Sequence, residues 1–231
     1  LDLSYFGLES QNINFNSFFS YIVSLIWIVG LVNAFNWLDG LDGLATGSAI
    51  IIATSIFIIS LINYKYDILL ITVLLIGNCL AFLFYNKMPS TILMGDGGSY
   101  FLGFIFAILS LLVSSDNFSI FSINYPLMMM LVPIGDMFFV ILNRLRKRLS
   151  PFCPDRSHLH YKLIDLGFDH SQSVRQIYTY VIATSLISID LQTDFFNGTI
   201  GCLGIMLLLL NFLIHQKKFI SALKNNLWIN K

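Results

Sequence analysis

One glycine-rich stretch of the chain holds two carboxylates and two amides within a few residues of one another. Residues Asn33–Gly47 read NAFNWLDGLDGLATG, and the chain on both sides, Phe18–Val32 and Ala49–Ile62, is almost purely apolar. Ionisable groups at the edge of a membrane are rare and usually functional. An interhelical loop would also contain glycines, but it does not need two acids and two amides at this spacing. We therefore expect chemistry at the lipid–water boundary, carried by Asn33, Asn36, Asp39 and Asp42.

A second polar segment, GDGGSYFLGF (Gly95–Phe104), places Asp96 among three glycines directly before another apolar run. The glycines would let a metal ion and the backbone approach the carboxylate, and the N-terminus of the following helix would attract phosphate. Mg²⁺ prefers carboxylate oxygens together with substrate phosphates. Asp96 therefore suits contact with a metal ion or a phosphate, with helix capping as its alternative role.

The third polar segment, PDRSHLHYKLIDLGF (Pro154–Phe168), combines an acid, a guanidinium and two imidazoles near its start. Arg156 suits bidentate binding of phosphate. His158 and His160 would diverge by about 200° on a helix, so a shared metal ion would require a non-helical turn. Together with Cys153 they do not make a standard zinc site, because a fourth ligand is missing. We expect phosphate or uridine contacts here rather than zinc.

The composition sets the class of protein in which these segments act. The pool AVILMFWYC makes up 56% of the 231 residues and charged residues only 11%, whereas soluble domains carry about 25% charged residues. The formal net charge is zero, which gives no electrostatic basis for binding nucleic acid. The 3 cysteines are scattered and indicate no disulfide framework. These features predict an all-α, polytopic membrane protein.

Seven apolar runs are long enough to cross a bilayer as helices. Basic residues crowd the loop 144–175 and follow the last run, and the positive-inside rule places both regions in the cytoplasm. This orientation puts all three polar segments on the cytoplasmic face, where they would form one composite site, and leaves only Lys65 outside among the basic residues. The seven runs are 18–35, 46–62, 67–85, 100–114, 123–142, 177–190 and 197–214.

Other residues near these segments have two interpretations each. Asp136 lies within the apolar run 123–142, and a buried acid there is a functional candidate that could equally pair with a neighbouring helix. Arg144 and its basic neighbours are interpreted first as topology determinants and second as an electrostatic funnel for anions. The leucines of residues 159–166 recur at helical spacing, which predicts a short amphipathic helix on the membrane surface, ended by Gly167.

The three polar segments, in this order, resemble the motifs of the polyprenyl-phosphate N-acetylhexosamine-1-phosphate transferases of glycosyltransferase family 4. That superfamily includes undecaprenyl-phosphate GlcNAc-1-phosphate transferases and phospho-MurNAc-pentapeptide transferases. The D-R-x-H-x-H form of the third segment is more similar to the GlcNAc-1-phosphate branch. The resemblance, which covers about Ser20 to Val174, implies transfer of a sugar 1-phosphate from a UDP-sugar to a polyprenyl phosphate. UMP would be released, in the synthesis of cell wall or surface polysaccharide.

The resemblance also implies roles for individual residues. Asp96 and Asp39 would bind Mg²⁺, with Mn²⁺ as the alternative, and Asp39, Asp42 and Asp96 would be the catalytic acids. The implied partners are a UDP-N-acetylhexosamine, undecaprenyl phosphate and the lipid bilayer of the cell membrane, with no nucleic acid and with a homodimer left open. The residues expected to bind substrate are Asn33, Asn36, Asp155, Arg156, His158 and His160.

The chain departs from the family pattern in two respects. Tyr161 stands where the family usually has a third histidine, and no adjacent Asp-Asp pair occurs anywhere in the chain. We therefore expect residues 1–231 to form one membrane domain that is a piece of a larger transferase, without its N-terminal spans.

Two other functions remain as alternatives. One is a catalytically inactive or split remnant that binds a nucleotide-sugar or a partner chain. The other is a small-solute transporter, which fits less well because Asp39, Asp42 and Asp96 lie at the ends of predicted spans rather than within the membrane.

Overall fold

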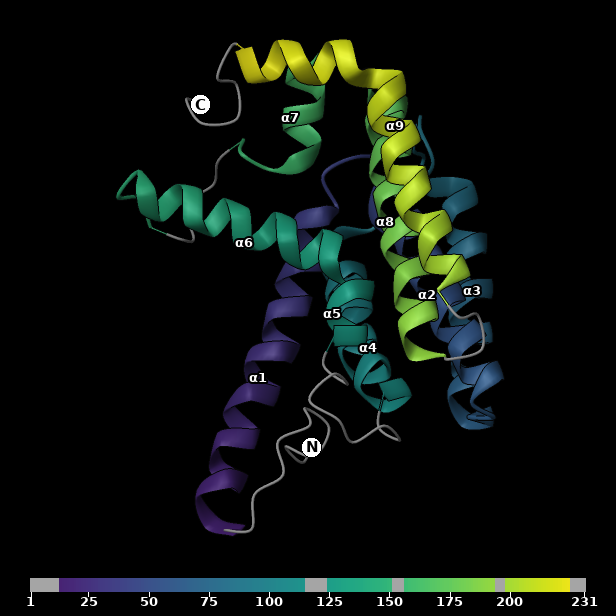
Figure 1. Cartoon of the computed structure of the whole chain (residues 1–231). Helices are drawn as coiled ribbons and strands as arrows, with labels where there is room; N and C mark the ends of the chain where they lie inside the picture. The colour runs from purple at the N-terminus through teal and green to yellow at the C-terminus, as the bar shows by residue number, and fades with distance from the viewer. Residues whose placement is uncertain (1–12, 115–123, 151–155, 194–197, 225–231) are drawn as a thin grey trace.

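The computed structural model describes residues 13–114, 124–150, 156–193 and 198–224, and within these ranges every regular element is an α-helix (Figure 1). The expected all-α class is therefore confirmed. The helices are α1 (Ile13–Leu38), α2 (Leu44–Ile62), α3 (Tyr66–Asn86), α4 (Gly95–Ser114), α5 (Asn124–Met129), α6 (Leu131–Arg146), α7 (Leu159–Asp165), α8 (His170–Gln192) and α9 (Thr199–Lys224).

Five helices in the described part of the chain are long and apolar enough to cross a bilayer. They are α1, α2, α3, α4 and α9, and each overlaps an apolar run predicted from the sequence. The protein is therefore a multi-pass membrane protein. The candidate spans are Tyr21–Leu38, Leu44–Ile62, Tyr66–Asn86, Gly95–Val113 and Thr199–Gln216.

The expectation of one continuous helix over the apolar run 123–142 is wrong. The run is divided into α5 and α6, and α6 lies across the neighbouring helices at a steep angle (Figure 1). Pro133 explains the division, because it has no N–H to donate to the carbonyl of Met129 and its ring would collide with that carbonyl. Met130 instead becomes the N-cap of α6, and Pro133 falls in the first turn, where no N–H partner is needed.

The run 177–190 lies inside a longer helix, α8, that starts seven residues earlier at His170. A capping box fixes this start: the Gln172 N–H donates to the Asp169 carboxylate at 2.6 Å, and the Asp169 N–H donates to the Gln172 side chain at 3.2 Å. Within the described ranges, α8 is not among the five helices that meet the length and apolarity of a membrane span. The total of seven spans stays a prediction.

The packing of α1 against α4 positions the first two polar segments. The Trp27 Nε1–H donates to the Ala107 carbonyl at 3.2 Å, and the rings of Phe35 and Phe106 stack with centroids 5.1 Å apart. Gly103 allows this approach, because a Cβ there would collide with the backbone of Leu31. The two helices run in opposite directions, so the C-terminus of α1 comes beside the N-terminus of α4. The rest of the bundle forms as α2 packs on α3 and α8, and α8 packs on α9.

Lys65, the basic residue expected outside, has a structural partner. Its Nζ donates to the carbonyls of Leu112 and Val113, at 2.9 Å in each case. These carbonyls belong to the last turn of α4, whose partial negative charge attracts a cation. Lys65 therefore stabilises the end of α4 that lies away from the polar segments.

Candidate active site

The C-terminal end of α1 and the N-terminal end of α4 bring the first two polar segments into direct contact. The Asn36 Nδ2 amide donates to Asp96 Oδ1 at 3.0 Å and to Ser99 Oγ at 3.1 Å. Ser99 is buried, and its hydroxyl donates in turn to the carbonyls of Gly95 and Asp96 at 3.2 Å each. A single amide thus joins two motifs that lie about 60 residues apart in the sequence.

Asp39 lies in the turn after α1, close to two other carboxylates. Burial, together with the negative charges of Asp96 and Asp42, raises the pKa of Asp39 to about 6. A divalent cation near Asp39 and Asp96 would relieve this repulsion. Within the described ranges, no three His, Cys, Asp or Glu side chains converge on one metal position. The two carboxylates fit Mg²⁺, which takes one or two carboxylates and completes its shell with water and substrate phosphate.

Asp42 differs from Asp39 in its environment, because the Asp42 carboxylate accepts a hydrogen bond from a backbone N–H group. The Ser90 N–H donates to Asp42 Oδ2 at 3.1 Å, so the carboxylate holds the loop between α3 and α4. The Tyr178 hydroxyl of α8 donates to the Gly43 carbonyl at 2.6 Å. The turn between α1 and α2 is thereby anchored on both sides, and Asp42 orients the loop that leads into Asp96.

The third polar segment reaches the first one through its imidazoles. The His160 ring lies against Gly40, where a Cβ would overlap it. It stacks on the ring of His158 with centroids 5.6 Å apart, and His158 meets Trp37 edge-on at 5.5 Å. Burial lowers the pKa of His160 to about 4, so its imidazole is neutral at pH 7. Neither ring nitrogen of His160 has a hydrogen-bond partner in the described part of the chain.

Asp136 of α6 holds the beginning of α7. Its Oδ2 lies 3.0 Å from His158 Nδ1, and its Oδ1 accepts the Leu159 N–H at 2.6 Å. The sequence left open whether Asp136 pairs with a neighbouring helix. In the structure it pairs with the start of α7, in the third polar segment. The short helix expected over residues 159–166 is confirmed as α7, and Gly167 follows its C-cap.

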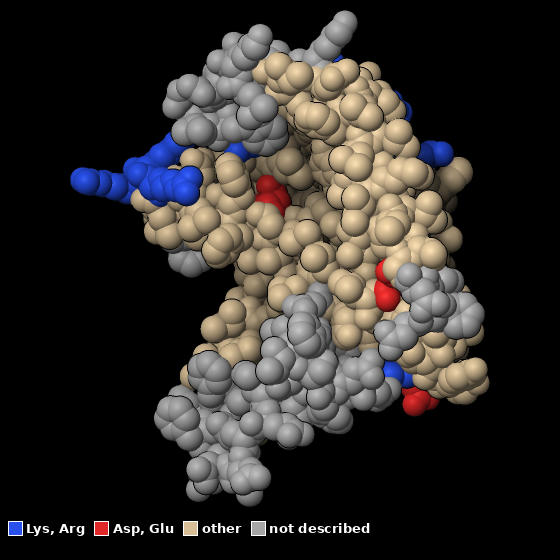
Figure 2. All heavy atoms as spheres, viewed as in Figure 1, with Lys and Arg blue, Asp and Glu red and all other residues tan. Residues whose placement is uncertain are grey.

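Arg144 and Trp37 belong to the site, although the sequence analysis gave neither of them a contact there. The Arg144 guanidinium lies 4.9 Å from the ring centroid of Trp37, and Arg144 is only 4% exposed despite its charge. The spacing of Pro133, Asp136, Val140 and Arg144, all buried on one face of α6, is the signal that could have found it. Arg146, in contrast, is exposed, and basic side chains project from this end of α6 in Figure 2.

Some predicted site residues are not brought into these contacts. The Asn33 amide donates to the Val29 carbonyl of its own helix at 2.7 Å. Arg156 is exposed, and its guanidinium lies 5.0 Å from the ring centroid of Tyr161. Asp155 lies outside the described residues.

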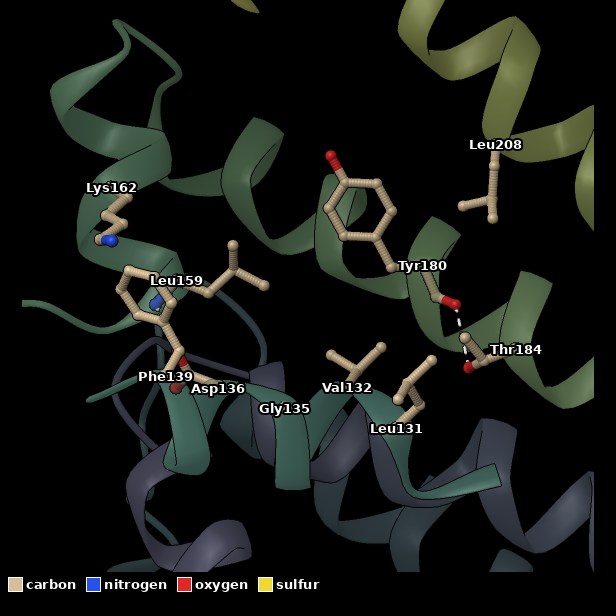
Figure 3. A pocket seen from close by; sticks show the side chains of 10 residues that line it. All are labelled: Leu131, Val132, Gly135, Asp136, Phe139, Leu159, Lys162, Tyr180, Thr184 and Leu208. Carbon is tan, nitrogen blue, oxygen red and sulfur yellow. Dashed lines mark hydrogen bonds between the residues drawn. The ribbon is translucent and has the colours of Figure 1, made fainter. Parts of the chain in front are cut away.

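An apolar cavity of about 370 Å³ lies beside the site, between α6, α7, α8 and α9 (Figure 3). Its walls include Leu131, Phe139 and Leu208, and its charged groups are Asp136 and Lys162. The Lys162 ammonium lies 3.4 Å from the ring centroid of Phe139. Figure 2 shows the same side of the molecule hollowed above α6. Asp136 therefore borders this cavity while it binds the third polar segment.

Comparisons with known proteins agree with the motifs. Residues 2–114 match the family described as Glycosyl transferase family 4. The chain is 38% identical over 174 residues to a probable undecaprenyl-phosphate N-acetylglucosaminyl 1-phosphate transferase of Bacillus subtilis, a match over 75% of this chain and 49% of the relative. It is 36% identical over 181 residues to the decaprenyl-phosphate N-acetylglucosaminephosphotransferase of Mycobacterium leprae, a match over 70% of this chain and 46% of the relative.

A relative with a different name matches over a shorter stretch. The chain is 41% identical over 107 residues to the phospho-N-acetylmuramoyl-pentapeptide-transferase of Lactococcus lactis, covering 46% of this chain and 32% of that protein. The chain spans about half the length of the first two relatives. These matches agree with the resemblance carried by the three polar segments: over residues 2–114 the chain is similar to glycosyl transferase family 4, and the relatives that it matches are phospho-sugar transferases by name.

Proposed function

We propose that the protein containing this chain transfers N-acetylglucosamine 1-phosphate, or a related N-acetylhexosamine 1-phosphate, from a UDP-sugar to a polyprenyl phosphate. The product would be a lipid-linked sugar pyrophosphate for cell-wall or surface polysaccharide, and UMP would be released. The names of the matching relatives support both the sugar and the polyprenyl acceptor. The polar segments and the basic loop would face the cytoplasm.

The observation that carries this proposal is the meeting of the three polar segments. Asn36 binds both Asp96 and Ser99, while His160 lies on Gly40, in the turn that follows α1. The site therefore combines clustered carboxylates with buried imidazoles at the end of two membrane-spanning helices. Transfer between two phosphate anions needs such a combination, because charge must be neutralised and both reactants must be held in place.

In the proposed reaction, an oxygen of the polyprenyl phosphate forms a bond to the β-phosphorus of the UDP-sugar. The bond from that phosphorus to the bridging oxygen breaks, and UMP leaves with the electron pair. Mg²⁺, or Mn²⁺ in its place, would supply neutralisation and orientation of the pyrophosphate when bound.

Each residue of the site has a proposed part in this reaction. Asp39 and Asp96 would hold the cation, and Asp42 would keep the loop before Asp96 in position through Ser90. The buried, neutral imidazole of His160 would keep water out of the turn that carries Asp39. The residues proposed to bind the substrates are Asn33, Asn36, Asp155, Arg156, His158 and His160.

A transfer assay tests the proposal. Purified protein in lipid nanodiscs is incubated with MgCl₂, undecaprenyl phosphate and either UDP-GlcNAc or UDP-MurNAc-pentapeptide. We expect UMP and lipid-linked GlcNAc pyrophosphate in equal amounts from the first donor, and slower turnover of the second. If UDP-GlcNAc raises the melting temperature of the protein but no UMP appears with either donor, the protein is a nucleotide-sugar binder and not a transferase.

A further inference from the structure

Both oxygens of one buried carboxylate, that of Asp136, contact the third polar segment. Asp136 is 8% exposed, and its Oδ1 and Oδ2 bind Leu159 and His158 at 2.6 and 3.0 Å. Asp136 lies on a different helix, 22 and 23 residues earlier in the chain. These contacts tie α6, which crosses the bundle, to the loop that carries both histidines.

The contact with Leu159 caps α7 from another helix. Leu159 is the first residue of α7, and His158, the N-cap, makes no side-chain cap hydrogen bond. The backbone N–H groups of a first helical turn need acceptors from outside the helix, and a carboxylate is a strong one. Asp136 supplies this acceptor, so the position of α7 depends on α6.

The contact with His158 decides where that imidazole carries its proton. An ionised carboxylate only accepts hydrogen bonds, so the nitrogen that faces it must be protonated. In a neutral ring, Nδ1 then carries the hydrogen and Nε2 keeps its lone pair. Within the described ranges, the hydrogen bond found for the His158 ring is the one between Nδ1 and Asp136, and it leaves Nε2 open to another group. Stacking on His160 and the edge contact with Trp37 hold the plane of the ring.

We propose that Asp136 is a positioning residue, which fixes His158 as the Nδ1–H tautomer and so presents Nε2 as a hydrogen-bond acceptor. The group that it would accept from is an O–H or N–H of the bound nucleotide-sugar, such as a sugar hydroxyl or the acetamido N–H. The assignment of the tautomer stands on the geometry alone, and only its consequence for substrate rests on the proposed function.

Nitrogen NMR of the wild-type chain tests the tautomer directly. The chain contains 4 histidines, so ¹⁵N-histidine labelling in lipid bilayers gives few signals, and a His158→Gln variant assigns the one that matters. At pH 7.5 we expect Nδ1 of His158 to show the shift of a protonated ring nitrogen and Nε2 that of an unprotonated one. The opposite pattern, or a ring protonated at both nitrogens, would overturn the proposal.

An Asp136→Asn variant adds a second test. The new amide can still accept from the Leu159 N–H, but it turns an N–H toward His158 Nδ1, so the ring proton should move to Nε2. Asp67→Asn, at an exposed position in the first turn of α3, is the matched control and should leave the His158 signals unchanged. An unchanged tautomer in folded Asp136→Asn would show that Asp136 does not set it.

A kinetic arm separates the inference from the proposed function. Asp136→Asn should lower kcat/KM for UDP-GlcNAc by about 10- to 100-fold, by analogy with the loss when a carboxylate that orients a metal-binding histidine is replaced. Asp136→Glu should retain more activity than Asp136→Ala, because it keeps an acceptor. The expected tautomer in a protein without transferase activity would overturn the proposed function alone, whereas the wrong tautomer in an active protein would overturn this inference alone.

Discussion

At the scale of single residues, Gly40 shows how closely the first and third polar segments approach each other. A Cβ at this position would overlap the His160 ring, and His160 is 2% exposed and cannot easily move aside. Gly40→Ala should therefore lower the free energy of unfolding by about 1–3 kcal/mol, the usual cost of overpacking. Thermal or chemical unfolding in detergent would measure this loss.

A double-mutant cycle identifies the cause of that loss. In a His160→Ala background the added methyl group has room, so Gly40→Ala should cost less than half as much as in the wild type. Equal costs in the two backgrounds would mean that the two segments are not in contact at Gly40.

The pKa of Asp39 leads to a prediction about pH. It lies at about 6 in the folded protein against an ordinary value of 3.8, mainly because of burial. A raised pKa means that the folded state holds the proton more tightly, so this stabilisation is complete below about pH 4 and is lost as the pH rises to about 6. Asp39→Asn cannot ionise and escapes the loss.

Melting temperatures measured from pH 4 to pH 7.5 without divalent cations test this prediction. The melting temperature of Asp39→Asn, relative to the wild type, should rise with pH across this window. Asp67→Asn, whose carboxylate is exposed, serves as the control. Parallel curves for the wild type and Asp39→Asn would mean that Asp39 is not held in a repulsive, half-buried environment.

At the scale of helices, the pair α1 and α4 controls the meeting of the first two segments. Gly103 faces the backbone of Leu31 and Val32, which cannot rotate away as a side chain could. Gly103→Ala should separate the helices, weaken the contact from Asn36 to Asp96, and cost about 1–3 kcal/mol of stability. Transfer activity should fall with it.

Gly77 of α3 offers a matched control for this substitution. It also lies within an apolar helix, but a Cβ there meets nothing within 4 Å. Gly77→Ala should leave stability and activity close to wild type. If the two variants behaved alike, close packing of α1 on α4 would not be what positions the site.

The helices also show which parts of the structure the sequence predicts. The short helix α7 and the first polar segment at the end of α1 follow from local patterns of glycine and apolar spacing. The helix α4 starts at Gly95, before the apolar run predicted from residue 100, so Asp96 lies in its first turn and not ahead of it. The break before α6 depends on Pro133. This residue lies within the apolar run 123–142, which is long enough for a membrane span, so the length of the run does not indicate a break. Run length alone cannot reveal that one residue redirects a helix across the bundle.

Side-chain partners are the least predictable part of the site. The bridge from Asn36 to Asp96 spans 60 residues, and the contact of Arg144 with Trp37 spans more than 100. Such pairs depend on how the helices pack, and a single sequence does not contain that information. The roles of all the residues expected to bind substrate stay predictions. For Asn33 and Asp155 the structure adds no contact in the site, since the first amide binds its own helix and the second residue lies outside the described ranges.

At the scale of the whole molecule, the proposed orientation can be tested by labelling. In a variant whose three cysteines are replaced by alanine, single cysteines are introduced at Thr91, between α3 and α4, and at Tyr64, between α2 and α3. Both positions are exposed. We expect a membrane-impermeant thiol reagent to reach Tyr64→Cys in intact cells, and Thr91→Cys only after the membrane is opened. Labelling of both positions from the same side would contradict the arrangement of α3 as a span.

In the proposed function, the clustered carboxylates at the ends of α1 and α4 would carry out a cation-dependent transfer of sugar phosphate. Asp96→Asn keeps a side chain that can still accept from Asn36, so the fold should persist, but a neutral amide is a poorer ligand for Mg²⁺. The most direct measurement is the rate of UMP release by Asp96→Asn and by the control Asp67→Asn, each as a function of MgCl₂ concentration. We expect the control to match the wild type, and Asp96→Asn to lose nearly all activity at every concentration. Wild-type turnover with an unchanged dependence on Mg²⁺ in Asp96→Asn would contradict the assignment of this site.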